Sequence, residues 1–284
     1  STLSPNDTSD KIVQIAYNNF LREPLRTFAR EEVQKYDGLA AKDHIGEIGD
    51  SIRAKLIADH VGPLFHKRKN PVRILDWDHN WDDVQSPLTV LANEKARPYI
   101  AGVAWHCYGG EVQAQSQVHA AYPDKETYFT ECSGGEWKPH WEETLPWYMK
   151  HLIIGTTRNW AKGVLLWNLA LDENHGPHLG GCKDCRGVVT INSVTGKVTK
   201  NFDYYALAHA SRFVRQGARR IDSSSGIDGI ETVAFQNADD QSIVLVVLNG
   251  ASEGRQFSVA FKGKTIRQEL PSASVMTLTW RDFE

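Results

Sequence analysis

Hydrophobic and polar positions follow three successive patterns along the chain. From residue 9 to about 33, and again from about 51 to 60, apolar residues recur at helical spacing. From residue 71 the pattern becomes short apolar runs separated by helical stretches. After about residue 214 apolar and polar residues alternate with a period of two. The sequence therefore predicts a helical opening, an α/β region and a β region.

Apolar runs in the α/β region have the length and content of strands buried in a parallel sheet. These runs are residues 72–77, 100–106, 127–130 and 164–167. Helical patterns separate them, at about 88–96, 116–121 and 145–160. Strands that alternate with helices form βαβ units. Four such strands make half of a (β/α)8 barrel.

The β region begins after a predicted helix at about 204–214. Its predicted strands are residues 230–235, 242–248, 256–261 and 274–280. Asn249-Gly250 and Lys262-Gly263 are hairpin-like turns between them. We therefore expect an antiparallel β-sandwich at residues 216–284, after a half barrel at 67–215 and an N-terminal helical segment at 1–66.

Polar and aromatic side chains stand at the end of each predicted barrel strand. The four ends read DWDHNW from Asp76, HCYGG from His106, TECSGG from Thr130 and WN at Trp167 and Asn168. In (β/α)8 barrels the active site is built at the carboxyl ends of the strands, with several strands contributing side chains. This edge is therefore the predicted active site.

Glu131 is the sharpest candidate for chemistry among these residues. It follows an aromatic strand and precedes Ser133-Gly134-Gly135, whose small size leaves space for a ligand. The alternative is a glutamate at a strand end that pairs with a nearby cation. Local pattern alone does not separate these two interpretations.

Several motifs resemble glycoside hydrolase family 30, the glucosylceramidase-like proteins. They are ILDWDHNWDD, IAGVAWHCYGG, YFTECSGGEW, VLLWNLALDENHGP and YYALAHASRFV, followed by IVLVVLNG and VMTLTW near the end. The resemblance covers roughly the last three quarters of the chain. It implies a (β/α)8 barrel with a flanking β-sandwich, here as a partial barrel comprising the second half. It also implies a retaining β-glycosidase.

The resemblance also implies roles for individual residues. Glu131 matches the catalytic nucleophile, and Tyr108 matches a tyrosine that contacts it; His106 lies beneath it on the same strand face. Trp167 is similar to the tryptophan under the sugar, and Asp78 and Asn168 are candidates for contacts with sugar hydroxyls. The chemistry requires no cofactor and no metal, because two carboxyl groups perform the transfers themselves.

The chain departs from the family at the acid/base residue. The family places this glutamate in an Asn-Glu-Pro motif, whereas the similar tripeptide here is Arg22-Glu23-Pro24, in a helical pattern. Glu23 is therefore a displaced acid/base candidate, with a glutamate on a helix surface as the alternative. The region before residue 71 is also too short for four βα units. The sequence thus resembles the C-terminal part of a family member.

Two functions remain open at this point. One is hydrolysis of β-glucosidic linkages in a glycoside, oligosaccharide or glycolipid by double displacement. The other is a truncated carbohydrate-binding remnant that lacks the acid/base. A half barrel exposes edge strands, which dimerisation, a second chain or the N-terminal helices could cover.

The four cysteines are a separate question. Cys182 and Cys185 form a C-x-x-C motif, which is compatible with a local disulfide, with reduced thiols, or with zinc if His175 and His178 complete the site. A thiol-redox or metal function for this motif is a third alternative. Cys107 and Cys132 are expected to be small packed residues on neighbouring strands.

Composition narrows the possible partners. Apolar residues make up 41% and charged residues 24%, which is typical of a globular protein, and the net charge of −3 argues against nucleic acid. No apolar run is long enough to span a membrane. The family and a glycosylation sequon at Asn6 favour a secreted or periplasmic location. Nine tryptophans and nine tyrosines offer surfaces on which sugar rings could stack.

Overall fold

The computed structural model describes residues 49–68, 72–178 and 181–281. The predicted helices before residue 34 and the candidate Glu23 lie outside these residues. The chain divides into two compact units. Of the described residues, the first unit contains 49–68, 72–76 and 85–101, and the second contains 77–84, 102–178 and 181–281.

In the first unit, a partly buried ion pair links a helix to the start of a strand. The helices α3 (Asp50–Leu56), η2 (Ile57–Val61) and α4 (Gly62–His66) form a continuous helical stretch. The helices α5 (Gln85–Ala92) and η3 (Arg97–Tyr99) come later in the chain, after strand β1 (Ile74–Trp81). Arg53 Nε donates to Asp76 Oδ1 at 2.7 Å, and Arg53 Nη2 donates to Ser86 Oγ at 2.8 Å. Asp76 was the first residue of the strand end DWDHNW that was predicted to face the active site. It is 2% exposed and paired with Arg53, so its role is structural.

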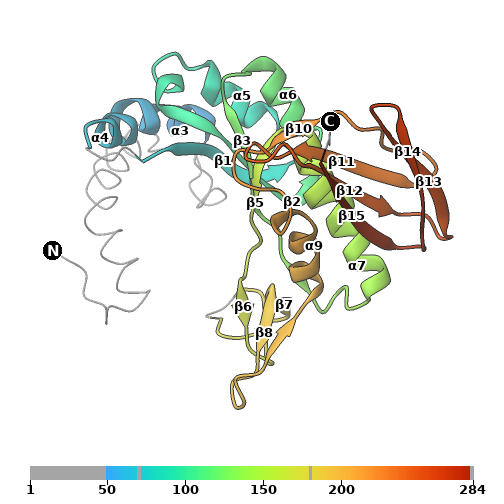
Figure 1. The fold of residues 1–284 in the computed structure, drawn as a ribbon. Helices are drawn as coiled ribbons and strands as arrows, with labels where there is room; N and C mark the ends of the chain where they lie inside the picture. Colours follow the sequence, from blue (N-terminus) through green and yellow to red (C-terminus); the bar gives the residue numbers. More distant parts are fainter. Residues whose placement is uncertain (1–48, 69–71, 179–180, 282–284) are drawn as a thin grey trace. The chain divides into compact units, whose positions relative to one another are not determined.

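A parallel sheet organises the barrel part of the second unit. Its strand order is β1 (Ile74–Trp81), β2 (Ile100–Gly110), β3 (Glu126–Glu131) and β5 (Ala161–Val164). All four strands are labelled in Figure 1. The pairs β2·β3 and β3·β5 are parallel. Helix α6 (Ala114–Ala121) connects β2 to β3, and α7 (Trp141–Tyr148), η4 (Met149–Gly155) and α8 (Thr156–Arg158) connect β3 to β5. This is the partial (β/α)8 barrel that the sequence predicts.

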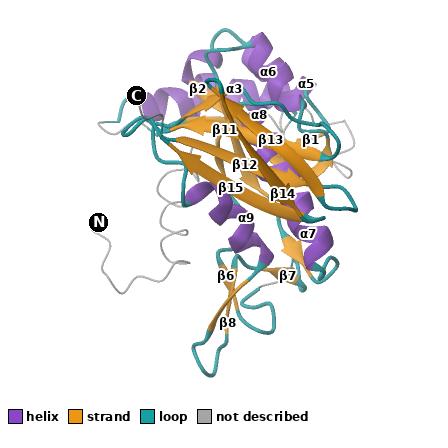
Figure 2. Ribbon diagram, turned by 45° about the vertical axis from the view of Figure 1, so that its right-hand side comes forward, coloured by secondary structure: helices purple, strands orange, loops and turns teal. Residues whose placement is uncertain are grey.

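A β-sandwich follows helix α9 (Phe202–Ser211) in the same unit (Figure 2). One sheet has the order β10 (Arg219–Ile221), β11 (Ile230–Gln236), β12 (Ile243–Asn249) and β15 (Ser274–Trp280), with all neighbours antiparallel. The other is the hairpin of β13 (Arg255–Phe261) and β14 (Lys264–Leu270). Every residue of β12 is buried, which explains its nearly continuous apolar sequence.

Contacts between helices and strands join the sandwich to the barrel part. Arg158 Nη1 donates to the Thr232 carbonyl at 3.1 Å, so the end of α8 is tied to β11. His209 Nδ1 on α9 lies 2.9 Å from Thr277 Oγ1 on β15. These two links are within the second unit.

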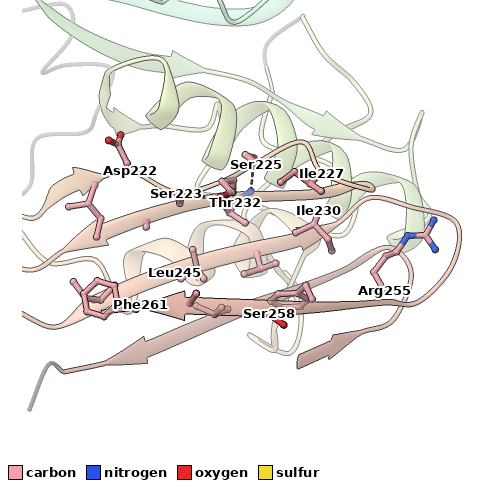
Figure 3. Close-up of a pocket in the computed structure, with 18 of the residues that line it drawn as sticks. Asp222, Ser223, Ser225, Ile227, Ile230, Thr232, Leu245, Arg255, Ser258 and Phe261 are labelled. Carbon is pink, nitrogen blue, oxygen red and sulfur yellow. Dashed lines mark hydrogen bonds between the residues drawn. The ribbon is translucent and has the colours of Figure 1, made fainter. Parts of the chain in front are cut away.

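A cavity of about 430 Å³ lies in the sandwich (Figure 3). Its wall is largely apolar and includes Ile230, Leu245 and Phe261. At its polar margin the Thr232 amide donates to Ser225 Oγ at 2.8 Å. All the residues that line this cavity belong to the sandwich segment 221–280, so it is separate from the predicted active site.

Short strands complete the second unit. Strand β4 (Gly134–Gly135) pairs antiparallel with β7 (Cys185–Arg186). A three-stranded sheet contains β6 (Ala170–Leu171), β8 (Val189–Ile191) and β9 (Val198–Lys200). Figure 1 shows β6, β7 and β8 in the yellow part of the chain. Cys132 and Ser133 separate the candidate nucleophile from β4, so the pairing of β4 with β7 fixes the loop after Glu131.

Two predicted elements differ in the structure. The strand predicted at 164–167 is observed at Ala161–Val164, although Leu165 N still donates to the Phe129 carbonyl at 2.9 Å. The apolar run therefore continues beside β3 after the regular ladder ends. The Asn249-Gly250 hairpin was also a wrong prediction, because β12 pairs with β11 and β15 and the chain then crosses to the other sheet. Lys262-Gly263 is a two-residue hairpin turn with φ of +47° and +78°.

Candidate active site

Glu131 is the last residue of β3, and its side chain is 22% exposed. The parallel ladder between β2 and β3 shifts its register between Trp105 and His106, which places His106 opposite Glu131. Such irregularities redirect side chains at the end of a strand. The two residues therefore share the carboxyl edge of the sheet, as the sequence predicts.

His106 lies between two carboxylates. Its Nε2 is 3.0 Å from Asp78 Oδ1, and its Nδ1 is 3.9 Å from Glu131 Oε1. An ionised carboxylate only accepts hydrogen bonds, so we assign a proton on Nε2 that points to Asp78. Only 8% of His106 is exposed, so these contacts fix the orientation of its ring.

Asp78 is held in an unusual backbone conformation. Trp77 and Asp78 have φ of +75° and +53°, in the left-handed region that few side chains adopt. Thr130 Oγ1 donates to Asp78 Oδ1 at 2.8 Å. The hydrogen bonds from His106 and then Thr130 lower the pKa of Asp78 below its ordinary value. Strained backbone that persists in a cluster of polar contacts is typical of functional sites.

Tyr108 is coupled to Glu131 from the end of β2. Partial burial of this half-exposed side chain raises the pKa of the Tyr108 hydroxyl, and the charge of Glu131 and a hydrogen bond to its carboxylate raise the pKa further. The hydroxyl therefore stays protonated at neutral pH and donates to Glu131. The Tyr108 amide donates to Asn80 Oδ1 at 3.1 Å, which anchors the strand end to the residues after β1.

A disulfide joins the two strands that carry the site. Cys107 and Cys132 are bonded, with Cα atoms 5.5 Å apart, so the expectation of packed thiols was wrong. The ladder pairs His106 with Glu131 and so brings the next residue of each strand side by side. The resulting Cα–Cα distance of 5.5 Å lies in the range that a disulfide requires. The signal in the sequence is limited to the position of both cysteines at predicted strand ends, where Cys107 precedes Tyr108 and Cys132 follows Glu131.

The C-x-x-C motif forms the second disulfide, between Cys182 and Cys185. This confirms the local disulfide among the three alternatives for the motif. Ser133 Oγ donates to Cys185 Sγ at 3.0 Å, so this loop contacts the residues that follow Glu131. Within residues 49–68, 72–178 and 181–281, no cluster of side chains is suited to bind a metal ion.

Trp167 and Asn168 lie beyond the end of β5. The Trp167 amide donates to the Cys132 carbonyl at 3.1 Å, which keeps the segment beside the end of β3, and Trp167 is 56% exposed. The carbonyl of Asn168 accepts a hydrogen bond from the Val188 amide at 2.9 Å. Their assigned contacts with sugar remain predictions.

A buried network supports the turn after Glu131, and sequence analysis did not identify it. Tyr148 Oη donates to Asp203 Oδ1 at 2.7 Å, and Arg186 Nε donates to Asp203 Oδ2 at 3.0 Å. Arg186 Nη1 also donates to the carbonyl of Gly135 at 3.1 Å. A Cβ on Gly134 would lie 2.2 Å from Tyr148 Oη, so this position requires glycine.

The fold and this edge define a class of protein. Parallel strands that alternate with helices and carry polar side chains at their carboxyl ends are features of (β/α)8-barrel enzymes, and carboxylates perform the chemistry of most glycosidases. Residues 37–214 match the glycosyl hydrolase family 30 TIM-barrel domain, and residues 217–278 match the glycosyl hydrolase family 30 beta sandwich domain. The chain belongs to glycosyl hydrolase family 30, which confirms the resemblance seen in the sequence.

Individual relatives include two kinds of enzyme. The endo-1,6-β-D-glucanase of Neurospora crassa is 36% identical over 205 residues, which cover 68% of this chain and 41% of the relative. The lysosomal acid glucosylceramidase of Mus musculus is 26% identical over 247 residues, which cover 79% of this chain and 46% of the relative. A solved endo-β-1,6-glucanase superposes with a TM-score of 0.76 at 31% identity, over 83% of this chain and 54% of that one. The chain thus spans less than half the length of these curated relatives.

The described helices include none that is long and apolar enough to cross a membrane.

Proposed function

We propose that this chain carries the nucleophile of a retaining β-glycosidase and acts on β-linked glucose polymers. The observation that carries the proposal is the placement of Glu131. Its carboxylate stands at a strand end, accepts a hydrogen bond from a protonated Tyr108, and faces His106 Nδ1 at 3.9 Å. A hydrogen-bonded carboxylate that remains ionised is the form required for nucleophilic attack.

In the proposed reaction, Glu131 attacks the anomeric carbon of a β-glucoside. A covalent glycosyl-enzyme ester forms as the bond to the leaving oxygen breaks, and water then hydrolyses the ester to restore the carboxylate. Tyr108 holds the carboxylate in position by its hydrogen bond, and the His106 ring packs beside it. Asp78 acts through His106, because its carboxylate accepts the Nε2 hydrogen and orients the ring.

The natural reaction also needs a carboxyl group that protonates the leaving oxygen, about 5 to 5.5 Å from the nucleophile. The sequence has no Asn-Glu-Pro motif, in which the family places this group. We therefore propose that the acid/base lies outside the residues that the structure describes. Glu23 and a residue of a second chain are the two candidates.

The relatives favour a glucan as the substrate. The endo-1,6-β-D-glucanase of Neurospora crassa is 36% identical to this chain, whereas the mouse glucosylceramidase is 26% identical. The solved structure with 31% identity is also an endo-β-1,6-glucanase. We therefore propose a β-1,6-linked glucan, rather than a glycolipid, as the substrate of this chain.

The test is hydrolysis of two aryl β-glucosides by the purified 284-residue chain. A 2,4-dinitrophenyl glucoside needs little acid assistance, whereas a 4-nitrophenyl glucoside needs more. We expect turnover of the first substrate, and a loss of at least roughly a thousandfold in the Glu131→Gln variant. Turnover of the second would show that an acid/base is present.

Glu126→Gln is the matched control, because Glu126 lies at the opposite end of β3 and its side chain is also 22% exposed. This variant should retain full activity. If the well-folded chain hydrolyses neither substrate yet binds glucosides, the enzyme proposal is wrong and the chain is a carbohydrate-binding remnant.

A further inference from the structure

A pocket of about 440 Å³ adjoins the candidate active site within the second unit. Its lining comes from the end of β2, the loop after β3, helix α7 and Arg186 on β7. Tyr108 lines this pocket and also contacts Glu131, so the two sites share a wall. The Cys107–Cys132 disulfide contributes to the lining as well.

We infer that this pocket binds a second glucose unit of a β-linked glucan, next to the unit that Glu131 attacks. The inference rests on the proposed function and adds to it the part of the molecule that selects the substrate class. A glucan presents another sugar ring beside the reacting unit, whereas a glucosylceramide presents a lipid. The lining of the pocket distinguishes these two ligands.

Aromatic rings dominate the accessible wall. Tyr108, Trp137 and Trp147 all line the pocket and are 52%, 50% and 41% exposed. Tryptophan and tyrosine combine an apolar face with a polar edge, which suits the C–H faces and hydroxyl rim of a pyranose. The volume lies at the lower end of the range for small-molecule sites, as one or two sugar rings require.

Polar groups at the margin favour a neutral, hydroxyl-rich ligand. Lys138 Nζ and Glu143 Oε2 form an ion pair at 2.8 Å, with side chains 63% and 56% exposed. Their charges cancel, so the margin offers both donors and acceptors without attracting an ion. An acyl chain would have to displace water from both charged groups and gain no hydrogen bond in return.

The position of Trp137 is built into the backbone. A Cβ on Gly135 would lie 1.9 Å from the Trp137 ring, so the ring packs directly on the glycine. Gly135 in turn pairs with Cys185 in the short ladder between β4 and β7. The loop that follows the candidate nucleophile thus also presents the ring.

Titration calorimetry tests the inference in the Glu131→Gln background, which prevents turnover. The probes are glucose, gentiobiose (two β-1,6-linked glucose units) and octyl β-glucoside. We expect gentiobiose to bind more tightly than glucose. Trp137→Ala should weaken gentiobiose about tenfold, or about 1.4 kcal/mol, and leave glucose unchanged. Gly135→Ala retains the indole but displaces it, and should act in the same direction.

Tyr205→Ala is the control, because Tyr205 is 41% exposed on α9 and does not line the pocket. Circular dichroism establishes whether each variant is folded. If Trp137→Ala is not folded, Trp137→Phe is used in its place. The inference is overturned if gentiobiose affinity is the same with and without Trp137. It is also overturned if Trp137→Ala weakens the affinity for octyl β-glucoside rather than that for gentiobiose, which would indicate a lipid aglycone.

Failure of this inference is distinguishable from failure of the proposed function. Turnover of a dinitrophenyl glucoside requires one sugar ring and Glu131, whereas the calorimetric difference requires the second ring and Trp137. Turnover with no effect of Trp137 would refute the pocket alone. An effect of Trp137 with no turnover would refute the nucleophile and retain a sugar-binding pocket.

Discussion

Cys107 and Cys132 form a disulfide between the ends of two parallel strands, with Cα atoms 5.5 Å apart. Each cysteine is the chain neighbour of a residue in the candidate active site, since Cys107 precedes Tyr108 and Cys132 follows Glu131. The bond therefore restrains the distance across which the tyrosine and the carboxylate interact. It is both a stabilising link and a restraint on the site.

Removal of this disulfide should lower stability measurably. The bond closes a loop with a sequence separation of 25 residues, for which loop-closure entropy gives about 3.5 kcal/mol. Urea unfolding of the Cys107→Ala/Cys132→Ala double variant should show a loss of this order. The Cys182→Ala/Cys185→Ala variant is the comparison, because its separation of three residues predicts a smaller loss. Equal losses in both variants would contradict the argument.

Ionisation of Tyr108 should report on the charge of Glu131. Burial, the Glu131 charge and their hydrogen bond all raise the Tyr108 pKa, so the hydroxyl should not ionise at its ordinary value near 10. In the Glu131→Gln variant the charge is absent, and the pKa should fall toward that value. Ultraviolet absorbance of tyrosinate measures the change, and Tyr108→Phe identifies the signal. An unchanged titration would exclude the coupling.

Stability should decrease in mild acid through His209. Burial lowers the His209 pKa below 6.5, so the unfolded chain binds the proton more readily than the folded chain. The stabilising contribution is complete above the unfolded pKa of about 6.5 and is lost as pH falls toward the folded pKa. His209→Asn retains a polar partner for Thr277 and should reduce the pH dependence of the free energy of unfolding between pH 7.5 and 5. His151, whose pKa burial also lowers, should account for part of the remainder.

The pair of Arg186 and Asp203 should be essential for folding of the second unit. Their side chains are 8% and 2% exposed, so Asp203→Asn leaves a buried guanidinium without its counterion, at a cost of about 3 to 5 kcal/mol. Tyr148→Phe removes one hydrogen bond to the same carboxylate and should cost about 1 kcal/mol. Thermal or urea unfolding gives both values. A smaller loss for Asp203→Asn than for Tyr148→Phe would contradict the assignment.

Some strands were predictable because their residue pattern matches their burial. The run at 100–106 became β2, where it is apolar and mostly buried. The run at 127–130 became β3, in which Thr127 and Phe129 are buried and alternate with partly exposed residues. Strand β14 (Lys264–Leu270) was missed because it is polar and mostly exposed, and its pairing with β13 defines it instead. Strand β10 has three residues, which is too short for a period to show.

Prediction of the site followed the same limits. Glu131, His106 and Tyr108 were placed together because parallel strand ends share an edge of the sheet. The Cys107–Cys132 bond depends on the register between β2 and β3, which the alternation of residues does not reveal. The support from Arg186 and Asp203 comes from residues more than fifty positions after Glu131, so it could only be seen in three dimensions.

The most direct test of the central claim is covalent labelling of Glu131. A 2-deoxy-2-fluoro-β-glucoside with a dinitrophenyl leaving group needs little acid assistance and forms an ester that hydrolyses slowly. Incubation with the 284-residue chain, followed by proteolysis and mass spectrometry, should locate one fluoroglucosyl group on the peptide that contains Glu131. A label on another carboxylate, or no label on a folded chain, would contradict the assignment of Glu131 as the nucleophile.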